Sequence, residues 1–304
     1  MPQLRLSDAE YQRHRDAILT RLAGKNLAGL ISFNPNNVRY FSSFGFHSTE
    51  RPIAYVLTPT RSALLVPTLE QEHSAEFAIV DTIRTYPEYP GDRHPMLFLK
   101  DILVELGLDQ ASIGVDADGY GNVFGYRGPR VSELLPQARV TNVNDDIEYL
   151  QMINSPEELA LIRESARWGN LAHVYLQEYC QVGISETEIS MRASYEASQT
   201  MIRTLGAEYR SVGAGNMPAF ANFRGQIGKD SALPHAMTSN AKLKAGDVLV
   251  TGAGADVWSY GSELERTMIM GEPSPEQVKF FAFMLQAQTL ALDTIKPGIT
   301  CSAV

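Results

Sequence analysis

The sequence predicts an α/β protein of the α+β kind, built from two domains. Three observations lead to this prediction. The chain has 304 residues, about twice the length of an average domain. Helical and extended patterns alternate through the first half, as in a compact α/β domain with a mixed sheet. The second half instead has long amphipathic helices followed by glycine-rich strands, so we expect domains at residues 1–153 and 154–304.

The first domain should begin with a helix. Ser7 to Glu10 has the form of a capping box, and apolar residues then recur at helical spacing as far as Gly24. Further helices are expected at residues 69–77 and 95–106. Short apolar runs between turn-forming residues predict strands at residues 28–33, 38–41, 53–57, 63–66, 79–86, 111–115 and 139–143.

The second domain should open with two long helices. A serine followed by a proline and two glutamates begins the first, over residues 155–179, because proline suits the first turn of a helix. A Ser-x-x-Glu box begins the second, over residues 185–205. Glycine-rich extended pieces follow, and a last helix is expected at residues 275–295.

The composition excludes several classes of function. Charged residues make up 20% and hydrophobic residues 44% of the chain, as in an ordinary globular protein. The 26 basic against 35 acidic residues give a formal net charge of −9, and lysine and arginine form no run. Such a protein attracts neither nucleic acid nor an anionic membrane surface. A small molecule or a short peptide is therefore the expected substrate.

The cysteines and the amino terminus indicate the compartment. Cys180 and Cys301 are far apart and lack the spacing of a zinc knuckle or a disulfide framework, which favours a reducing environment. The first residues contain no apolar segment, and no stretch approaches the roughly 18 to 20 apolar residues that cross a membrane. We expect a cytoplasmic protein.

Three short patterns resemble functional motifs but are typical of structural positions. Gly252 to Val257 follows a strand, yet it lacks the third glycine of a dinucleotide loop, so a tight turn is expected there. Glu70 and His73 are one turn apart on a predicted helix, where a solvated charged face is commoner than a metal site. His173, inside a long helix, is expected to be a hydrogen-bonded structural histidine.

A histidine, two carboxylates and an arginine are expected on neighbouring strands of the second domain. These residues are His235, Glu263, Glu265 and Arg266. Alternate residues of a strand point to one face, so Glu263 and Glu265 should share a face and Arg266 should point to the other. Such a group could hold a cationic substrate, bind a metal or perform acid/base chemistry. A surface ladder of paired charges is the alternative.

Five short motifs occur in order over nearly the whole chain. They are Asn36–Phe41, Met152–Leu159, Pro234-His235 with Gly246-Asp247, Gly254–Thr267 and Ile295–Ser302. In this order they resemble the creatinase, prolidase and aminopeptidase P family, the pita-bread hydrolases. The resemblance implies an amino-terminal mixed-sheet α/β domain, the first half of a pita-bread catalytic domain, a hydrolytic activity and a homodimer.

The resemblance also implies two metal ions in the metal-dependent members. Alignment on Gly254, Tyr260 and Arg266 places Gly252 at the first ligating aspartate and Glu263 at the second. Glycine has no side chain to bind a metal, whereas Glu263 could still bind a cation through oxygen. We therefore expect no cofactor, with a divalent metal such as manganese, zinc, cobalt or iron as the alternative.

The metal-free branch of the family, creatinase, is more similar to this sequence in the hairpin motif. His235 falls on the histidine that serves as general acid and base in that branch, and Glu265 falls on a glutamate that binds a guanidinium group. Arg51 resembles an arginine that reaches the site of the partner subunit to hold a carboxylate. Glu263 and Arg266 would complete the substrate-binding set. A free imidazole, with a pKa of about 6.5, can activate water and then protonate a leaving nitrogen.

The last residue, Val304, falls where the resemblance has covered only the first half of the catalytic domain. The remaining histidine and both glutamate ligands of the metal-dependent members would lie beyond it. We expect the chain to be a piece of a longer protein or a natural short form, and to be inactive alone. It should expose an apolar face and a sheet edge.

Three functions remain open. The first is metal-independent hydrolysis of a C–N bond in a small nitrogen-rich substrate, with His235 as the acid and base. The second is a metal-dependent Xaa-Pro dipeptidase or aminopeptidase with an altered set of ligands. The third is a non-catalytic relative that binds a ligand or a partner, which the glycine at position 252 would allow.

Overall fold

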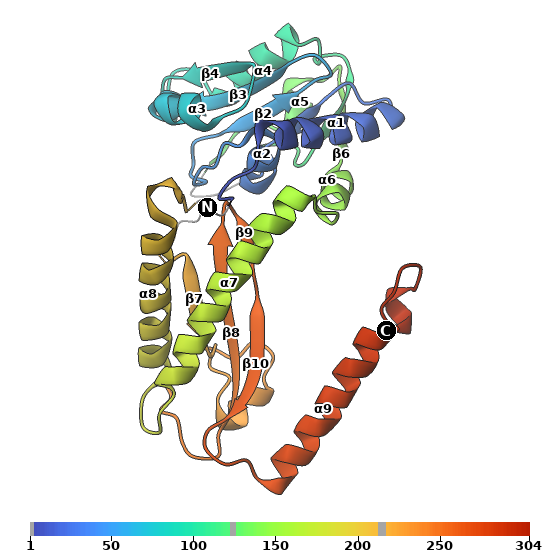
Figure 1. The fold of residues 1–304 in the computed structure, drawn as a ribbon. Coiled ribbons are helices and arrows are strands. Elements are labelled where there is room, and N and C mark those ends of the chain that lie inside the picture. The colour runs from blue at the N-terminus through green and yellow to red at the C-terminus, as the bar shows by residue number, and fades with distance from the viewer. Residues whose placement is uncertain (1–2, 122–125, 212–216) are drawn as a thin grey trace. The chain divides into compact units, whose positions relative to one another are not determined.

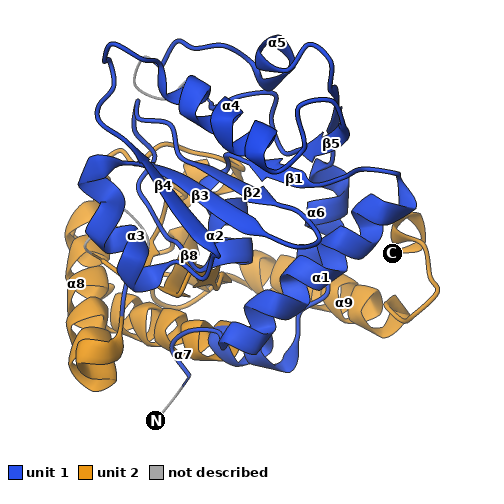
Figure 2. Cartoon of the chain, turned by 90° about the horizontal axis from the view of Figure 1, so that it is seen from above, with its two compact units in different colours: residues 1–161, 210–214 blue, residues 162–209, 215–304 orange. Residues whose placement is uncertain are grey.

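The computed structural model describes residues 3–121, 126–211 and 217–304. The chain divides into two compact units, coloured in Figure 2. Unit 1 contains residues 1–161 and 210–214, and unit 2 contains residues 162–209 and 215–304. The domain boundary expected after residue 153 stays a prediction.

Unit 1 is built on a six-stranded mixed sheet with the order β4-β3-β2-β1-β5-β6 (Figure 1). The pairs β1–β2 and β2–β3 are antiparallel, and the other pairs are parallel. The α/β fold with a mixed sheet that the sequence predicts is therefore confirmed. The strands are β1 Leu30–Ser32, β2 Ala54–Leu57, β3 Ser62–Pro67, β4 Thr82–Tyr86, β5 Ser112–Val115 and β6 Arg139–Asn142.

Two hydrophobic cores lie on the two faces of this sheet. Ile31 and Leu65 belong to one core together with residues of α4, while Leu30 and Leu64 belong to the other together with residues of α1 and α2. Alternate residues of one strand thus supply separate cores. The helices are α1 Asp8–Gly24, α2 Pro35–Ser42, α3 Gln71–Phe77, α4 Pro95–Glu105, α5 Val131–Leu134 and α6 Asn144–Gln151.

Residues 38–41 form part of helix α2, so the strand expected there is wrong. Asn34 caps this helix, because its side chain accepts a hydrogen bond at 2.9 Å from a backbone amide of the first turn. Pro35 occupies the first helical position. Val38 and Phe41 are three residues apart and both are fully buried. A short apolar run does not distinguish a strand from a helical turn. Here the cap at Asn34 favours the helix.

A buried carboxylate fixes the loop that leads from β1 into α2. Asp116 accepts hydrogen bonds from the amides of Phe33 at 2.9 Å and Asn34 at 3.0 Å. It also accepts hydrogen bonds from Asn37 Nδ2 at 3.1 Å and from the hydroxyl of Ser32. A buried charge is costly unless hydrogen bonds satisfy it, so Asp116 and these four donors hold one another in place.

Removing this carboxylate should destabilise the protein strongly. We expect Asp116→Ala to lower the free energy of unfolding by about 3 kcal/mol or more, because each buried donor left without an acceptor costs roughly 1–3 kcal/mol. Asp92→Ala removes an exposed carboxylate and should change it by less than about 0.5 kcal/mol. Urea denaturation followed by circular dichroism measures both. Equal effects of the two substitutions would contradict this assignment.

Unit 2 combines long helices with an antiparallel sheet of order β10-β8-β7, and β9 pairs with the end of β8 (Figure 1). The helices expected at residues 155–179, 185–205 and 275–295 are confirmed. Helix α7 begins in unit 1 and continues into unit 2. The elements are α7 Pro156–Tyr179, α8 Glu186–Leu205, β7 Ala219–Asn222, β8 Val248–Val257, β9 Tyr260–Gly261, β10 Leu264–Ile269 and α9 Pro275–Thr294.

Helices α7 and α8 cover one face of this sheet. The hydroxyl of Ser165 in α7 donates to the carbonyl of Ala255 at 2.6 Å, and that of Ser198 in α8 contacts the edge strand β7 in the same way. His173 Nε2 lies 2.9 Å from Thr251 Oγ1. His173 is therefore the buried, hydrogen-bonded histidine that the sequence predicts.

The glycine-rich segment 252–257 continues strand β8, so the tight turn expected there is wrong. The turn follows at Trp258 and Ser259, whose φ angles are +54° and +61°. Gly254 instead permits a close approach of β8 to the segment between β9 and β10, because a Cβ atom there would lie 2.3 Å from the carbonyl oxygen of Ser262. Glycine is therefore needed at this position for close packing and not for a turn.

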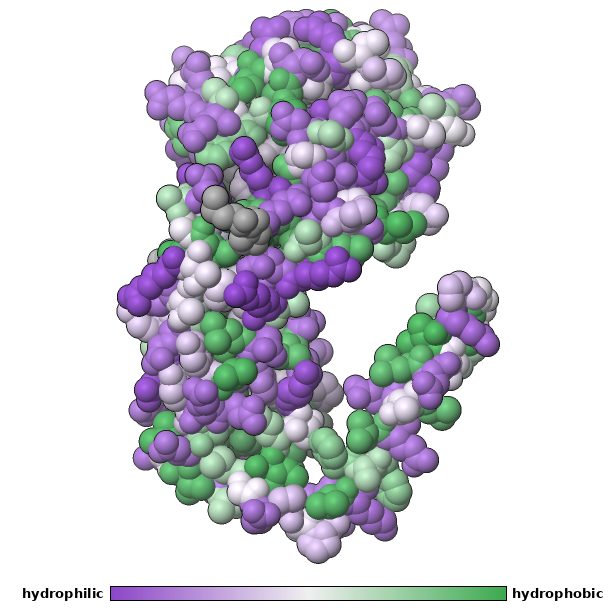
Figure 3. Space-filling model, viewed as in Figure 1, coloured by the Kyte–Doolittle hydropathy of each residue, from purple (hydrophilic) through white to green (hydrophobic). Residues whose placement is uncertain are grey.

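Helix α9 has no buried residue. Its exposed side chains include Phe280, Phe281, Phe283 and Met284, and Figure 3 shows hydrophobic residues in green along this helix. The exposed apolar face that the sequence predicts is present here. Within the described part of the chain, no helix has both the length and the hydropathy that crossing a membrane requires.

The packing of α7 on β8 should weaken in acid. The pKa of His173 is lowered by its burial and, to a smaller extent, by the charge of Arg266. The folded protein therefore keeps this histidine neutral, whereas the unfolded chain takes up a proton below a pH of about 6.5. The free energy of unfolding should fall as the pH drops through that value, and His173→Gln should reduce the fall.

Urea denaturation at a pH of about 7.5 and of about 5.5 measures this dependence. His47→Gln, which replaces an exposed histidine, serves as the control and should retain the wild-type dependence. An equal fall in the wild type and in His173→Gln would show that another group causes it.

Candidate functional site

The candidate site lies on the face of the unit 2 sheet opposite to α7 and α8, which we call the open face. Directly opposed residues of antiparallel strands point to the same face. Gly252 is opposed by Asn222 on β7 and by Glu265 on β10, and Gly254 is opposed by Phe220. A Cβ atom on Gly252 would lie 3.6 Å from Glu265 Oε1, and one on Gly254 would lie 3.0 Å from the Phe220 ring.

Arg224 lies on the open face, beside Gly252 and Glu265. Its guanidinium forms an ion pair with Glu265. It also lies over Gly252, because a Cβ atom on that glycine would be 3.5 Å from Arg224 Cζ. Arg224 has a φ of +52°, a left-handed conformation that costs a residue with a side chain roughly 1–2 kcal/mol, and Gly225 follows with +71°. These two residues are the centre of a tight turn after β7, closed by a hydrogen bond of 2.8 Å from the Gln226 amide to the Phe223 carbonyl, and this turn brings the arginine over the sheet.

A buried carboxylate holds the two loops of the site. Glu186, the first residue of α8, is 1% exposed. Its Oε2 accepts a hydrogen bond from the amide of Gly225 at 3.0 Å, and its Oε1 accepts one from the amide of Ser239 at 2.7 Å. The first bond fixes the loop of Arg224, and the second fixes the loop that follows His235. One side chain therefore positions both loops.

His235 lies on an exposed turn within the second loop, so the expectation that it occupies a strand beside the hairpin is wrong. On one side of the turn, Gln226 Nε2 donates to the carbonyl of Leu233 at 2.9 Å. On the other side, the Met237 carbonyl lies so close to Gly225 that a Cβ atom on this glycine would be 2.0 Å away. The loop is therefore packed against segment 225–226. His235 itself makes no hydrogen bond or ion pair with the described part of the chain.

The strand register fixes the face of only one of the two glutamates of the hairpin. Glu265 lies on the open face, whereas Glu263 precedes β10 and takes no part in the strand pairing, so its expected position beside Glu265 stays a prediction. Arg266 is opposed by Thr251 and points to the helix-covered face, as expected for its alternation with Glu265. Its Nη1 donates to the carbonyl of Glu265 at 2.7 Å.

Arg51 belongs to unit 1, where it forms ion pairs with Glu50 and Glu88. The hydrogen bond to Glu88 raises the pKa of its guanidinium. The pair of Glu70 and His73, 2.8 Å apart, lies at the surface of unit 1, which agrees with the solvated helix face expected from the sequence.

Neither Arg224 nor Glu186 is marked by a sequence motif. An arginine followed by glycine after an extended segment is the one local signal of a turn there, since glycine tolerates a positive φ. Glu186 directly follows the serine that caps α8, and acidic residues are common there because they suit the helix dipole. Its hydrogen bonds to Gly225 and Ser239 join segments that are distant in the sequence, so no local pattern predicts them.

The described residues of the open face do not fit a two-metal centre. Gly252 offers no ligand at the position of the first aspartate, and the guanidinium of Arg224 lies over it. A positive charge at this distance repels a divalent cation. Glu265 is already paired with that charge, and Glu263 lies outside the strand.

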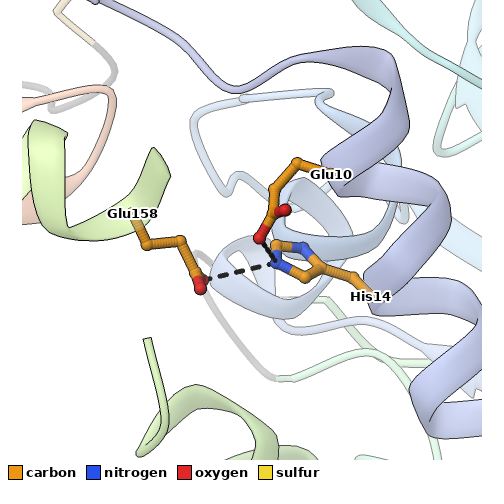
Figure 4. A group of neighbouring side chains, drawn as sticks. All are labelled: Glu10, His14 and Glu158. Atoms are coloured by element: carbon orange, nitrogen blue, oxygen red, sulfur yellow. Dashed lines mark ion pairs between the residues drawn. The ribbon is translucent and has the colours of Figure 1, made fainter. Parts of the chain in front are cut away.

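A second group of possible metal ligands lies in unit 1 and consists of Glu10, His14 and Glu158 (Figure 4). All three are buried. His14 Nε2 is 3.4 Å from a carboxylate oxygen of Glu10 and 3.3 Å from one of Glu158. His14 Nδ1 donates to the carbonyl of Tyr40 at 2.8 Å. Arg13 is ion-paired with both glutamates.

Charge balance argues against a divalent ion at this cluster. The two carboxylates carry two negative charges, and Arg13 already neutralises one of them. A divalent ion would leave an excess positive charge in a buried pocket, which is costly. We therefore interpret the cluster as an ion-pair network that attaches the first turn of α7, through Glu158, to α1.

Family models match both halves of the chain. The Creatinase/Prolidase N-terminal domain matches residues 14–153, and Metallopeptidase family M24 matches residues 160–304. An Xaa-Pro dipeptidase of Pyrococcus horikoshii is 27% identical, over 90% of this chain and 68% of its own length. A creatinase of a Bacillus species is 23% identical, over 97% of this chain and 69% of its own.

Solved structures with the same fold include two archaeal prolidases. The prolidase of Pyrococcus horikoshii has a TM-score of 0.70 at 22% identity. The matched region is 95% of this chain and 74% of the prolidase chain. The prolidase of Thermococcus sibiricus has a TM-score of 0.75 at 20% identity. The matched region is 96% of this chain and 74% of that prolidase chain. This chain therefore combines a creatinase/prolidase N-terminal domain with a metallopeptidase family M24 domain, and belongs to the hydrolase family that contains prolidases and creatinases.

Proposed function

We propose that the protein hydrolyses a C–N bond in a small nitrogen-rich substrate without a metal ion. Membership of the family supports hydrolysis. The observation that carries the metal-independent route is the position of Arg224, whose guanidinium lies over Gly252 where the metal-dependent relatives would require a carboxylate ligand. A site that contains a fixed positive charge and lacks a ligand favours acid/base chemistry by side chains.

His235 is the proposed general acid and base. Its imidazole takes a proton from a water molecule while the water oxygen forms a bond to the carbon of the C–N group. The C–N bond then breaks, and the same proton passes to the departing nitrogen. The exposed position of His235, without a partner in the described chain, leaves its ring free to contact a substrate.

Glu265 is the proposed partner for the positive end of the substrate. Its pair with Arg224 leaves both side chains partly exposed, at 44% and 36%, and exposed pairs contribute only about 0–1 kcal/mol. A substrate cation can therefore displace the arginine. In a homodimer, Arg51 of the partner subunit would hold a carboxylate, and Glu263 would flank the substrate. Arg266, on the other face of β10, would act only through its hydrogen bond to the carbonyl of Glu265.

A metal-dependent Xaa-Pro dipeptidase or aminopeptidase is the second candidate. The names of the Pyrococcus relatives favour it, since they are called Xaa-Pro dipeptidases. Gly252 and Arg224 weigh against it. A non-catalytic protein that binds a small ligand is the third candidate.

Replacement of the histidine tests the first candidate. We expect His235→Ala in the complete gene product to reduce turnover of guanidino or amide compounds at least about a hundredfold, which is the usual contribution of a general acid and base. The melting temperature should not change, because His235 is exposed. His47→Ala is the matched control. Unchanged turnover by His235→Ala would refute the assignment, and no turnover by the wild type would favour the binding protein.

Metal content separates the first two candidates. We expect the complete gene product, purified without chelator and supplied in turn with Mn²⁺, Zn²⁺ and Fe²⁺, to retain less than about one metal ion per chain, because Gly252 supplies no ligand. A chelator should leave turnover unchanged. Mass spectrometry of the metals and a chelator titration measure these quantities. About two ions per chain, with activity lost to the chelator, would establish the peptidase instead.

A further inference from the structure

Three buried polar atoms without hydrogen-bond partners lie close together in the sequence beside the open face. They are Asn222 Oδ1, Arg224 Nε and Gln226 Oε1, and none has a partner among the described residues. A buried polar atom without a partner costs roughly 1–3 kcal/mol, so such atoms are rare and each requires an explanation. The three residues alternate in the sequence around Arg224, and the unpaired Nε leaves part of its guanidinium without a hydrogen-bond acceptor among the described residues.

From this geometry we infer that Arg224 is an anion-binding residue that receives a carboxylate of the substrate. The inference rests on the proposed function, because it assigns the substrate to the open face. The guanidinium presents donors in a flat fork, which matches the two oxygens of a carboxylate. Only Nη2 of this fork has a partner among the described residues, namely Glu265.

The ion pair with Glu265 orients the guanidinium of Arg224 and is weak enough for a ligand to replace it. An exposed ion pair contributes only about 0–1 kcal/mol, so a substrate carboxylate can replace Glu265 on the guanidinium. When the substrate carboxylate binds Arg224, Glu265 is free to bind a positively charged group of the same substrate. Arg224 and Glu265 together therefore suit a ligand that carries both a carboxylate and a cationic nitrogen.

Gly252 keeps space beside the guanidinium. A Cβ atom there would meet Arg224 Cζ at 3.5 Å and Glu265 Oε1 at 3.6 Å, which are ordinary van der Waals distances. A small side chain therefore fits, and an acidic one would offer its carboxylate directly to the arginine. Glycine at this position leaves the guanidinium available to a ligand.

Binding of a matched pair of probes tests the inference. N-acetylglycine and N-acetylglycinamide differ only in the carboxylate, and isothermal titration calorimetry or nuclear magnetic resonance measures their affinities. We expect the acid to bind the wild-type protein at least about tenfold more tightly than the amide. Arg224→Gln should remove this difference. Arg192→Gln, which changes an exposed arginine that is also paired with a glutamate, should retain it.

Two substitutions of Gly252 keep the inference testable if Arg224→Gln does not fold. Gly252→Asp supplies an internal carboxylate next to the guanidinium and should abolish the preference for the acid. Gly252→Ala adds a carbon in the same place without a charge and should preserve it. Equal binding of acid and amide by the wild type, or an unchanged preference in Gly252→Asp, would overturn the inference.

The binding experiment is independent of catalysis. His235→Ala should bind N-acetylglycine as the wild type does, whether or not His235 is the acid and base. If the wild-type protein prefers the acid but shows no turnover, the anion site stands and only the proposed reaction is refuted. If the protein shows turnover but Arg224→Gln keeps the preference for the acid, only the anion site is refuted.

Discussion

The candidate site depends on one buried carboxylate, Glu186. The chain leaves β7 in a tight turn in which Arg224 has a positive φ, a conformation that a residue with a side chain does not favour, and the amide of Gly225 donates to Glu186. A buried amide needs an acceptor, and a buried carboxylate needs donors. Glu186 satisfies both needs with Gly225 and Ser239, so the loops of Arg224 and His235 are fixed by the start of one helix.

The position of the arginine follows from this constraint and determines the electrostatics of the site. Because the turn brings Arg224 over the sheet, the one charged partner of Glu265 on the described open face is a cation of the protein itself. The glycine at position 252 places no side chain beside it. The open face therefore presents a guanidinium, which favours anionic ligands.

Local signals in the sequence predict much of the fold but less of the site. Capping serines and periodic apolar residues locate α1, α8 and α9, because those determinants lie within a few residues of each helix end. The short apolar run at residues 38–41 is ambiguous, and its cap makes it helical. The place of Gly252 opposite Glu265 follows from a hairpin that is local in sequence. Arg224, Glu186 and the network around His14 depend on distant contacts, which one sequence does not reveal.

We infer that Arg224, rather than a metal ion, supplies the positive charge of the open face. Anomalous X-ray diffraction from crystals soaked with Mn²⁺ should then show no manganese peak beside Gly252, with Arg224 still paired with Glu265. A manganese ion bound by Glu263 or Glu265, with the arginine turned away, would contradict it.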